Sequence, residues 1–147
     1  MSCIRFSTPA QMTQLRQLAP SMLTREQAAS LHPAPAVTES KIRRLRLLAR
    51  DPNPKIRETV ASSRHAPAEV LAALSSDADD GVRACLARNE HAPVDLLRHL
   101  CSDGSEAVRG WVAVNARTPP DALSVLGIDS SAVVQGLLTW RASVTRL

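Results

Sequence analysis

A run of basic side chains is the densest group of potential ligand-binding residues in the chain: Lys41, Arg43, Arg44, Arg46 and Arg50. If the run is helical, three of the arginines share one side, while the leucines between them face the other way. Cations at this density attract phosphate or carboxylate groups, so the run predicts a contact with nucleic acid or with an acidic protein surface. An ordinary solvated helix face is the alternative. Aromatic residues make up only 2% of the chain, so a stacking platform for single-stranded nucleic acid is not expected.

Further basic residues recur in the turns that follow predicted helices. Arg64, Arg88 and Arg117 lie in such turns, whereas the turns that precede the helices are acidic, as at Asp79 and Asp80. Both placements complement the helix dipole, and we favour this interpretation. The alternative is a basic edge that joins the run at residues 41–50 in one anion-binding stripe. These three arginines and that run are the candidate anion-binding or nucleic-acid-binding residues.

Catalytic and metal-binding chemistry is not expected. His65 and His91 occupy equivalent places, but no third ligand accompanies them, so a zinc site is not predicted. Cys85 and Trp111 fall on an apolar helix face and are expected to fill the core. Phosphate-binding glycine loops, zinc-protease motifs and serine-hydrolase motifs do not occur. We therefore predict a protein that is not an enzyme and has no metal or cofactor. An enzyme acting on nucleic acid, like the helical-repeat DNA glycosylases, would need an acidic residue and an exposed tryptophan in one basic groove.

An internal repeat indicates which elements position these side chains. Asp51, Asp77, Asp103 and Asp129 follow one another every 26 residues, and each opens a similar segment. The first and second of these segments agree at 9 of 26 positions, as do the second and third. A fixed period in this range is typical of a solenoid, in which each unit buries its apolar face on its neighbours. Helical periodicity and a core of leucine, valine and alanine predict an all-α fold.

Each unit predicts two short helices, which would depend on stacking for their stability. In the third unit, Val108, Trp111 and Val112 recur at helical spacing, a cap precedes them at Asp103 or Ser105, and Asn115 ends the helix. The second helix opens at a proline, which is favoured at a first helical position because its missing N–H needs no partner there. These prolines are Pro67, Pro93 and Pro119.

One arginine recurs in each regular unit, as Arg57, Arg83 and Arg109. We predict a ladder in which each guanidinium binds the opening aspartate of its own or a neighbouring unit. Stacking would bring these groups close, and a bidentate ion pair suits a seam between units. The alternative is a line of phosphate or carboxylate contacts.

The ends of the chain depart from the pattern, as expected of terminal units that face water. We predict an N-terminal cap with a degenerate repeat over residues 1–37, regular repeats over residues 38–128 and a C-terminal capping repeat over residues 129–147, all in one domain. Four apolar residues of the last segment have no following unit to cover them: Val133, Leu137, Trp140 and Val144. They form a candidate interface for a partner or for a second copy of the chain, and simple capping by the final helix is the alternative.

The recurring Asp, Arg, Ala, Pro and Leu positions of residues 40–140 resemble the variant leucine-rich repeat family of bacteria. The resemblance implies a right-handed superhelix without β-strands, in which α-helices alternate with 3-10 helices, and it implies macromolecular binding without a known activity. HEAT-type repeats are the nearest alternative. One type of family member holds an iron–sulfur cluster in a cysteine-rich N-terminal segment. Only Cys3 lies in that segment here, and such clusters normally need four thiolates, so no cluster is implied.

Charge and cysteine usage complete the prediction. The net charge is +4, and the chain has three scattered cysteines without a CxxC pair, which favours a reducing compartment. No apolar stretch approaches the roughly 18 residues of a membrane span, so we expect a cytoplasmic protein without membrane contact. The sequence predicts a non-catalytic repeat scaffold for protein–protein interaction, with nucleic-acid binding through the basic residues as the alternative. The partner is an unknown macromolecule.

Overall fold

The computed structural model describes residues 37–144, and this part of the chain is all-α, as predicted. It contains eight helices and no strand: α3 (Glu39–Leu48), α4 (Pro54–Ala61), α5 (Ala68–Leu74), α6 (Asp80–Arg88), α7 (Val94–Leu100), α8 (Glu106–Val114), α9 (Pro120–Leu126) and α10 (Ala132–Val144). No helix in this range is long and apolar enough to cross a membrane. The predicted N-terminal cap lies outside the described residues, except for Val37, as do the last three residues of the predicted C-terminal cap.

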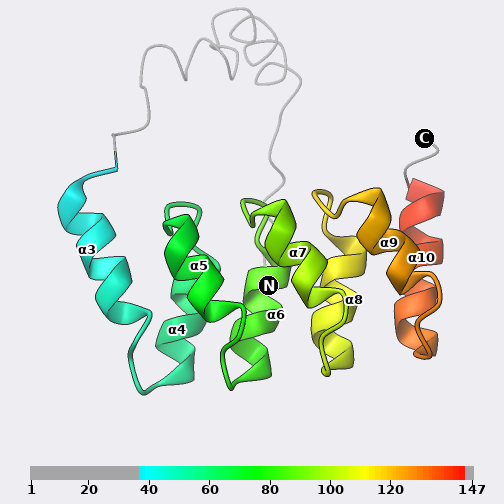
Figure 1. Ribbon diagram of the computed structural model, residues 1–147, viewed down its shortest axis with the longest axis horizontal. Helices are drawn as coiled ribbons and strands as arrows, with labels where there is room; N and C mark the ends of the chain where they lie inside the picture. The colour runs from blue at the N-terminus through cyan, green and yellow to red at the C-terminus, as the bar shows by residue number, and fades with distance from the viewer. Residues whose placement is uncertain (1–36, 145–147) are drawn as a thin grey trace, which may run out of the picture. The chain divides into compact units, whose positions relative to one another are not determined.

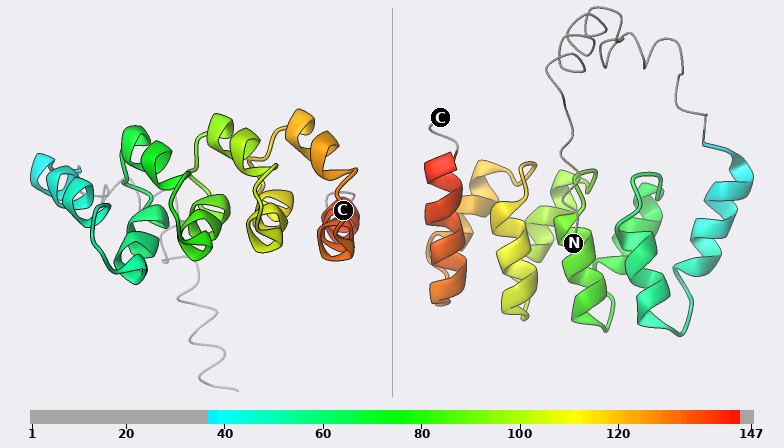
Figure 2. Two further views of the ribbon diagram at one scale, coloured as in Figure 1. Left: turned by 60° about the horizontal axis from the view of Figure 1, so that its bottom comes forward. Right: turned by 180° about the vertical axis from the view of Figure 1, so that it is seen from behind.

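The described helices lie in two layers (Figures 1 and 2). Helices α4, α6, α8 and α10 stand side by side in one layer, and α3, α5, α7 and α9 form the other. The core lies between successive helices of the first layer, where Val82, Leu86 and Val108 are fully buried, and leucines of the second layer close it, as at Leu97. Gly110 allows α10 to approach α8 closely, because a Cβ there would lie 3.1 Å from a methyl group of Leu137.

The helix starts differ from the sequence prediction by one position. Pro67, Pro93 and Pro119 occupy the N-cap, with extended ψ angles of 149°, 138° and 157°, rather than the first helical position. A proline fits the N-cap because that residue contributes only its carbonyl to the helix, so no N–H is missed. Both helices of each pair are α-helices, and the described residues contain no 3-10 helix in place of either. Even the seven-residue α5 opens with a bond from the N–H of Leu71 to the carbonyl four residues back.

The predicted arginine–aspartate ladder is confirmed. Arg83 donates from Nε and Nη2 to the two carboxylate oxygens of Asp103 at 2.7 and 3.0 Å. Its Nη1 donates to the backbone carbonyl of Asp77 at 2.6 Å. Each ladder arginine thus joins the loop before its own helix to the loop before the next first-layer helix. The other two pairs are Arg57–Asp77 and Arg109–Asp129.

A second ladder, which the sequence did not predict, uses the asparagines that end α6 and α8. Asn115 ends α8 as expected, and its Nδ2 donates to the carbonyls of Ala87 and Asn89 at 2.7 and 3.1 Å. Its Oδ1 accepts a hydrogen bond from the backbone N–H of Arg117 at 2.9 Å. Asn89 makes the same contacts one first-layer helix earlier, with carbonyls at the end of α4. At α10, Arg141 takes over these bonds and donates to carbonyls at the end of α8. One side chain therefore connects two neighbouring first-layer helices and fixes the turn that follows its own helix.

The arginine ladder ends at α10. Gln135 stands 26 residues after Arg109, and its Nε2 donates to the carbonyls of Leu126, Gly127 and Asp129 at 3.2, 2.9 and 3.1 Å. The amide donates to loop carbonyls, as the Nη1 group of each ladder arginine does. Because the amide is neutral, it needs no carboxylate from a helix beyond α10.

The ladder makes stability depend on pH. Hydrogen bonds from the paired arginines hold the pKa values of Asp77 and Asp129 below their ordinary value of 3.8. Burial is the largest single influence on the pKa of Asp103 and raises it, but the hydrogen bonds from Arg83 and the Ser105 N–H, together with the Arg83 charge, outweigh burial, and the pKa is again lowered. A carboxyl group with a depressed folded-state pKa stabilises the fold above its ordinary pKa, and this stabilisation is lost as the pH falls through the folded-state pKa. We expect the contribution of the ladder to the free energy of unfolding to be constant from neutral pH to about 5 and to fall steadily below about 4.

Urea denaturation at a series of pH values measures this loss. The Asp103→Ala variant is the control, since it lacks one of the shifted groups and should show a shallower decline in acid. A wild-type urea midpoint that does not change between neutral pH and about 3 would contradict the expectation.

Candidate binding groove

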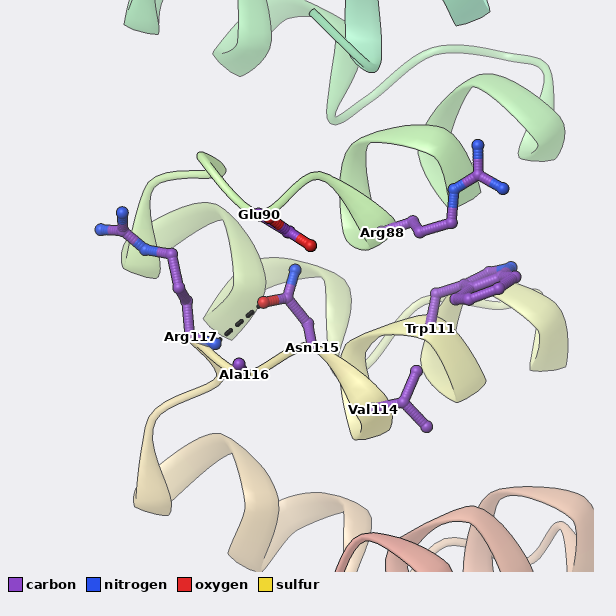
Figure 3. Close-up of a pocket in the computed structure, with 7 residues that line it drawn as sticks. All are labelled: Arg88, Glu90, Trp111, Val114, Asn115, Ala116 and Arg117. Atoms are coloured by element: carbon purple, nitrogen blue, oxygen red, sulfur yellow. Dashed lines mark hydrogen bonds between the residues drawn. The ribbon is translucent and has the colours of Figure 1, made fainter. Parts of the chain in front are cut away.

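Two adjoining pockets lie at the carboxyl ends of α6 and α8, and we call them together the Trp111 groove. Figure 3 shows the first of the two. The first pocket has a volume of about 350 Å³ and is lined by Arg88, Glu90, Trp111, Val114, Asn115, Ala116 and Arg117. The second has a volume of about 440 Å³ and is lined by Ser62, Arg64, Cys85, Arg88, Asn89, Glu90 and His91. The two pockets adjoin each other, because Arg88 and Glu90 line both.

Trp111 is not in the core, so the prediction that it fills the core is wrong. Its side chain is 40% exposed, whereas Val108 and Val112 on the same helix are fully buried. The equivalent positions in the preceding layers carry the small side chains of Thr59 and Cys85, the first exposed and the second half-buried. These three positions therefore lie at the rim of the contact between neighbouring first-layer helices. The large indole of Trp111 extends past this packed interface into the groove.

Arg88 lies against the exposed indole. Its guanidinium carbon is 5.4 Å from the centroid of the Trp111 ring, which is a cation–π distance. Figure 3 shows Arg88 and Trp111 on one side of the pocket, Arg117 on the other and Glu90 between them. The pocket therefore combines an aromatic surface, two cations and a carboxylate within one concave site.

The asparagine ladder positions the turns that carry these groove residues. The backbone N–H of His91 donates to Asn89 Oδ1 at 2.8 Å, and that of Arg117 makes the equivalent bond to Asn115. Both asparagines are buried. The backbone beneath the groove is thus fixed by the same asparagines that join neighbouring first-layer helices, so the groove is formed before any partner binds.

The three arginines of the predicted basic edge all line the groove, but they are not separated by the 26-residue spacing, so they do not occupy equivalent positions. Arg64 and Arg88 line the second pocket, and Arg88 and Arg117 line the first. Glu90 stands 26 residues after Arg64 and interrupts the cations with a carboxylate. The sequence prediction missed Glu90, although the repeat spacing places it beside the predicted basic residues.

The end of the groove near α4 carries a positive field. Burial is the first cause that lowers the pKa of His65, and the charges of Lys41 and Arg64 lower it further. Arg64 is exposed and makes no ion pair with a described residue, which leaves its charge available at the surface.

The predicted basic run on α3 lines a different pocket. Arg46 binds Glu69 of α5 at 2.8 Å and also lies 3.5 Å from Glu39. Within the described part of the chain, the other four members of the run are exposed and make no ion pair: Lys41, Arg43, Arg44 and Arg50. Arg43, Arg46 and Arg50 line a pocket with residues of α5 and with Leu47, which is 68% exposed.

The predicted apolar interface at the other end follows one side of α10. Val133 and Trp140 are each 57% exposed and Val144 is 52% exposed, whereas Leu137 is half-buried and packs on the core. These positions recur at helical spacing, so the exposed side chains form an apolar stripe.

Metal-ligating side chains do not cluster in the range 37–144. No group of three histidine, cysteine, aspartate or glutamate side chains there could hold a metal ion. Glu90 and Trp111 are an acidic residue and an exposed tryptophan in one groove, which is the requirement set above for an enzyme acting on nucleic acid. The Glu90 carboxylate makes no hydrogen bond or ion pair with any described residue.

Comparison with known proteins found no matching family model, no matching curated protein and no matching solved structure, so the resemblance to variant leucine-rich repeats stays a prediction.

Proposed function

We propose that the chain is a right-handed helical-repeat solenoid of 26-residue units and that it acts as a non-catalytic scaffold for protein–protein interaction. The recurrence of equivalent contacts supports the repeat architecture. Each ladder arginine pairs with an aspartate 20 residues further on, in three successive cases. The two asparagines likewise bind carbonyls 28 and 26 residues earlier. Side chains at equal positions along the sequence thus make equal contacts.

The observation that carries the binding proposal is the exposed indole of Trp111 beneath the Arg88 guanidinium in a preformed groove. Tryptophan and arginine are the residue types that most often dominate the binding energy of protein interfaces. A partner that covered the indole would gain roughly 25 cal/mol for each Å² of apolar surface removed from water. The apolar stripe on α10 is a second surface on which a partner or another copy of the chain could pack.

Substitution of Trp111 by alanine is expected to abolish partner capture. The wild-type protein, immobilised and exposed to a lysate of its source organism after nuclease treatment, should retain a protein that the Trp111→Ala variant does not retain. Once that protein is identified, calorimetry should show an affinity at least about tenfold weaker for the variant, because a central tryptophan typically contributes 2 kcal/mol or more. The matched control is Trp140→Ala, which removes the exposed tryptophan of α10 and should leave groove binding intact.

Circular dichroism should show the same helix content in both variants, because neither side chain is part of the buried core. Equal retention of the same proteins by the wild type and Trp111→Ala would contradict binding through the groove.

Nucleic-acid binding through α3 is the second candidate function. It is favoured by the four exposed cations of the basic run that have no ion-pair partner within residues 37–144. The capture experiment separates the two candidates. Retention that disappears with nuclease and is indifferent to Trp111→Ala would point to nucleic acid.

A further inference from the structure

The charges that line the Trp111 groove are mostly positive, and the cations have no carboxylate partner among the described residues. Arg64, Arg88 and Arg117 are exposed, and none of them makes an ion pair with a described residue. The arginines of the ladder, in contrast, are each held by a carboxylate at 2.6 to 2.7 Å. The groove therefore offers cations that no carboxylate of the described fold neutralises, and these attract an anionic ligand.

The apolar part of the groove selects for more than charge. Trp111, Val114 and Ala116 line the same pocket as Arg88 and Arg117, so a ligand that fills it must bring an apolar group between its anionic groups. A free anion would leave the indole exposed to water. This combination matches a polypeptide that carries acidic and apolar side chains.

Glu90 distinguishes a polypeptide from a nucleic acid. Its carboxylate lies between Arg88 and Arg117 (Figure 3) and has no hydrogen-bond donor among the described residues. A phosphodiester backbone offers no donor and would place a negative charge against it. A peptide backbone offers an N–H at nearly every residue, which a carboxylate accepts readily. One aromatic side chain is also too few for a run of stacked bases.

We infer that the Trp111 groove binds an extended acidic segment of a partner protein. An apolar side chain of the segment packs on Trp111 and Val114, its carboxylates pair with Arg88 and its neighbouring cations, and Glu90 accepts a backbone N–H. Adjacent helices pack roughly 8–10 Å apart, so the groove from α4 to α8 spans about 16–20 Å. An extended chain covers about 3.3 Å per residue, so about six residues fill it. This inference rests on the proposed function and adds the chemistry of the partner.

Selection from a phage library of random peptides tests the inference. The immobilised full chain is the target, and the Trp111→Ala variant serves for counter-selection. We expect the enriched peptides to be rich in aspartate and glutamate around one apolar residue. By fluorescence anisotropy, a labelled selected peptide should bind at least about tenfold more weakly to Trp111→Ala and to Arg88→Glu. Its binding to Arg98→Ala should be unchanged, because Arg98 of α7 does not line the groove.

The remaining outcomes overturn the inference in distinguishable ways. Enrichment of neutral or basic peptides that depend on Trp111 would overturn the acidic segment but leave protein binding in the groove intact. Failure to enrich any peptide that depends on Trp111 would overturn the inference, and the lysate capture would then decide the proposed function separately. Binding of a labelled oligothymidylate that depends on Trp111 would overturn it in favour of nucleic acid.

Discussion

Replacement of Asp103 by alanine is expected to lower the free energy of unfolding by about 3 kcal/mol. The carboxylate is only 8% exposed and accepts both parallel hydrogen bonds from Arg83. It also accepts the backbone N–H of Ser105 at 2.8 Å, which holds the loop before α8. Its removal leaves a guanidinium that is 18% exposed without a counter-charge and breaks the contact between α6 and the loop before α8. Removal of one partner of a largely buried pair costs more than the pair contributes, because the other charge stays desolvated.

Urea denaturation followed by circular dichroism measures this loss. The matched control is Asp121→Ala, which breaks a bond of similar length, 2.7 Å to Arg98, between residues that are about half exposed. Water replaces that contact, so the control should change stability little. Equal losses in the two variants would show that burial of the ladder does not contribute.

Replacement of Asn115 by alanine should cost about 2–3 kcal/mol. The buried amide donates to two backbone carbonyls of the preceding layer, at Ala87 and Asn89, and accepts the N–H of Arg117. Alanine removes all three bonds and leaves a space that the asparagine had filled. The carbonyl of Asn89 keeps its bond from the N–H of Ala92, but the other two groups lose the contact, and each buried polar group without a partner costs about 1–3 kcal/mol. Because the same bonds fix the turn beneath the Trp111 groove, peptide binding should weaken as well.

Thermal and urea unfolding check the effect on stability. Asn89→Ala, which removes the same contacts one layer earlier, should give a similar loss. Ser124→Ala is the neutral control, since that hydroxyl is exposed and bonds only within its own helix, to the carbonyl of Pro120. A loss for Asn115→Ala no larger than for Ser124→Ala would contradict the role of the asparagine ladder.

The sequence alone predicted the contacts that depend only on equal spacing. If segments stack in register, Arg83 must lie near the opening aspartate of its own or the next segment, whatever the details of the loops. The position of Asn115 at a helix end was predictable for a similar reason, because an asparagine followed by a turn competes well for backbone groups there. Its bonds to the preceding layer could not be foreseen, since they depend on which way the amide points.

Features that depend on the width of a contact, or on a shift of one residue, were not predicted. The position of Trp111 on a helical face suggested burial, but the periodicity gives the direction of a side chain and not the edge of the packed interface. A proline fits both the N-cap and the first helical position, because neither uses the N–H. The helix was therefore predicted to begin at Pro93, one residue before its start at Val94. Repeat spacing does place Glu90 beside the basic residues, but the hollow between the turns that carry Glu90 and Arg117 depends on turn conformations, which the spacing does not encode.

The neutral amide at Gln135 has a consequence for assembly. The ladder arginines at the equivalent earlier positions each extend a positive charge toward the next loop, where an aspartate of the following segment binds it. With glutamine, whose bonds all go to carbonyls of its own loop, another molecule that docked in the same orientation would find no cation for its leading aspartate. The arginine–aspartate contact that joins neighbouring first-layer helices therefore cannot form at α10, and this disfavours repeated end-to-end stacking of the chain into filaments.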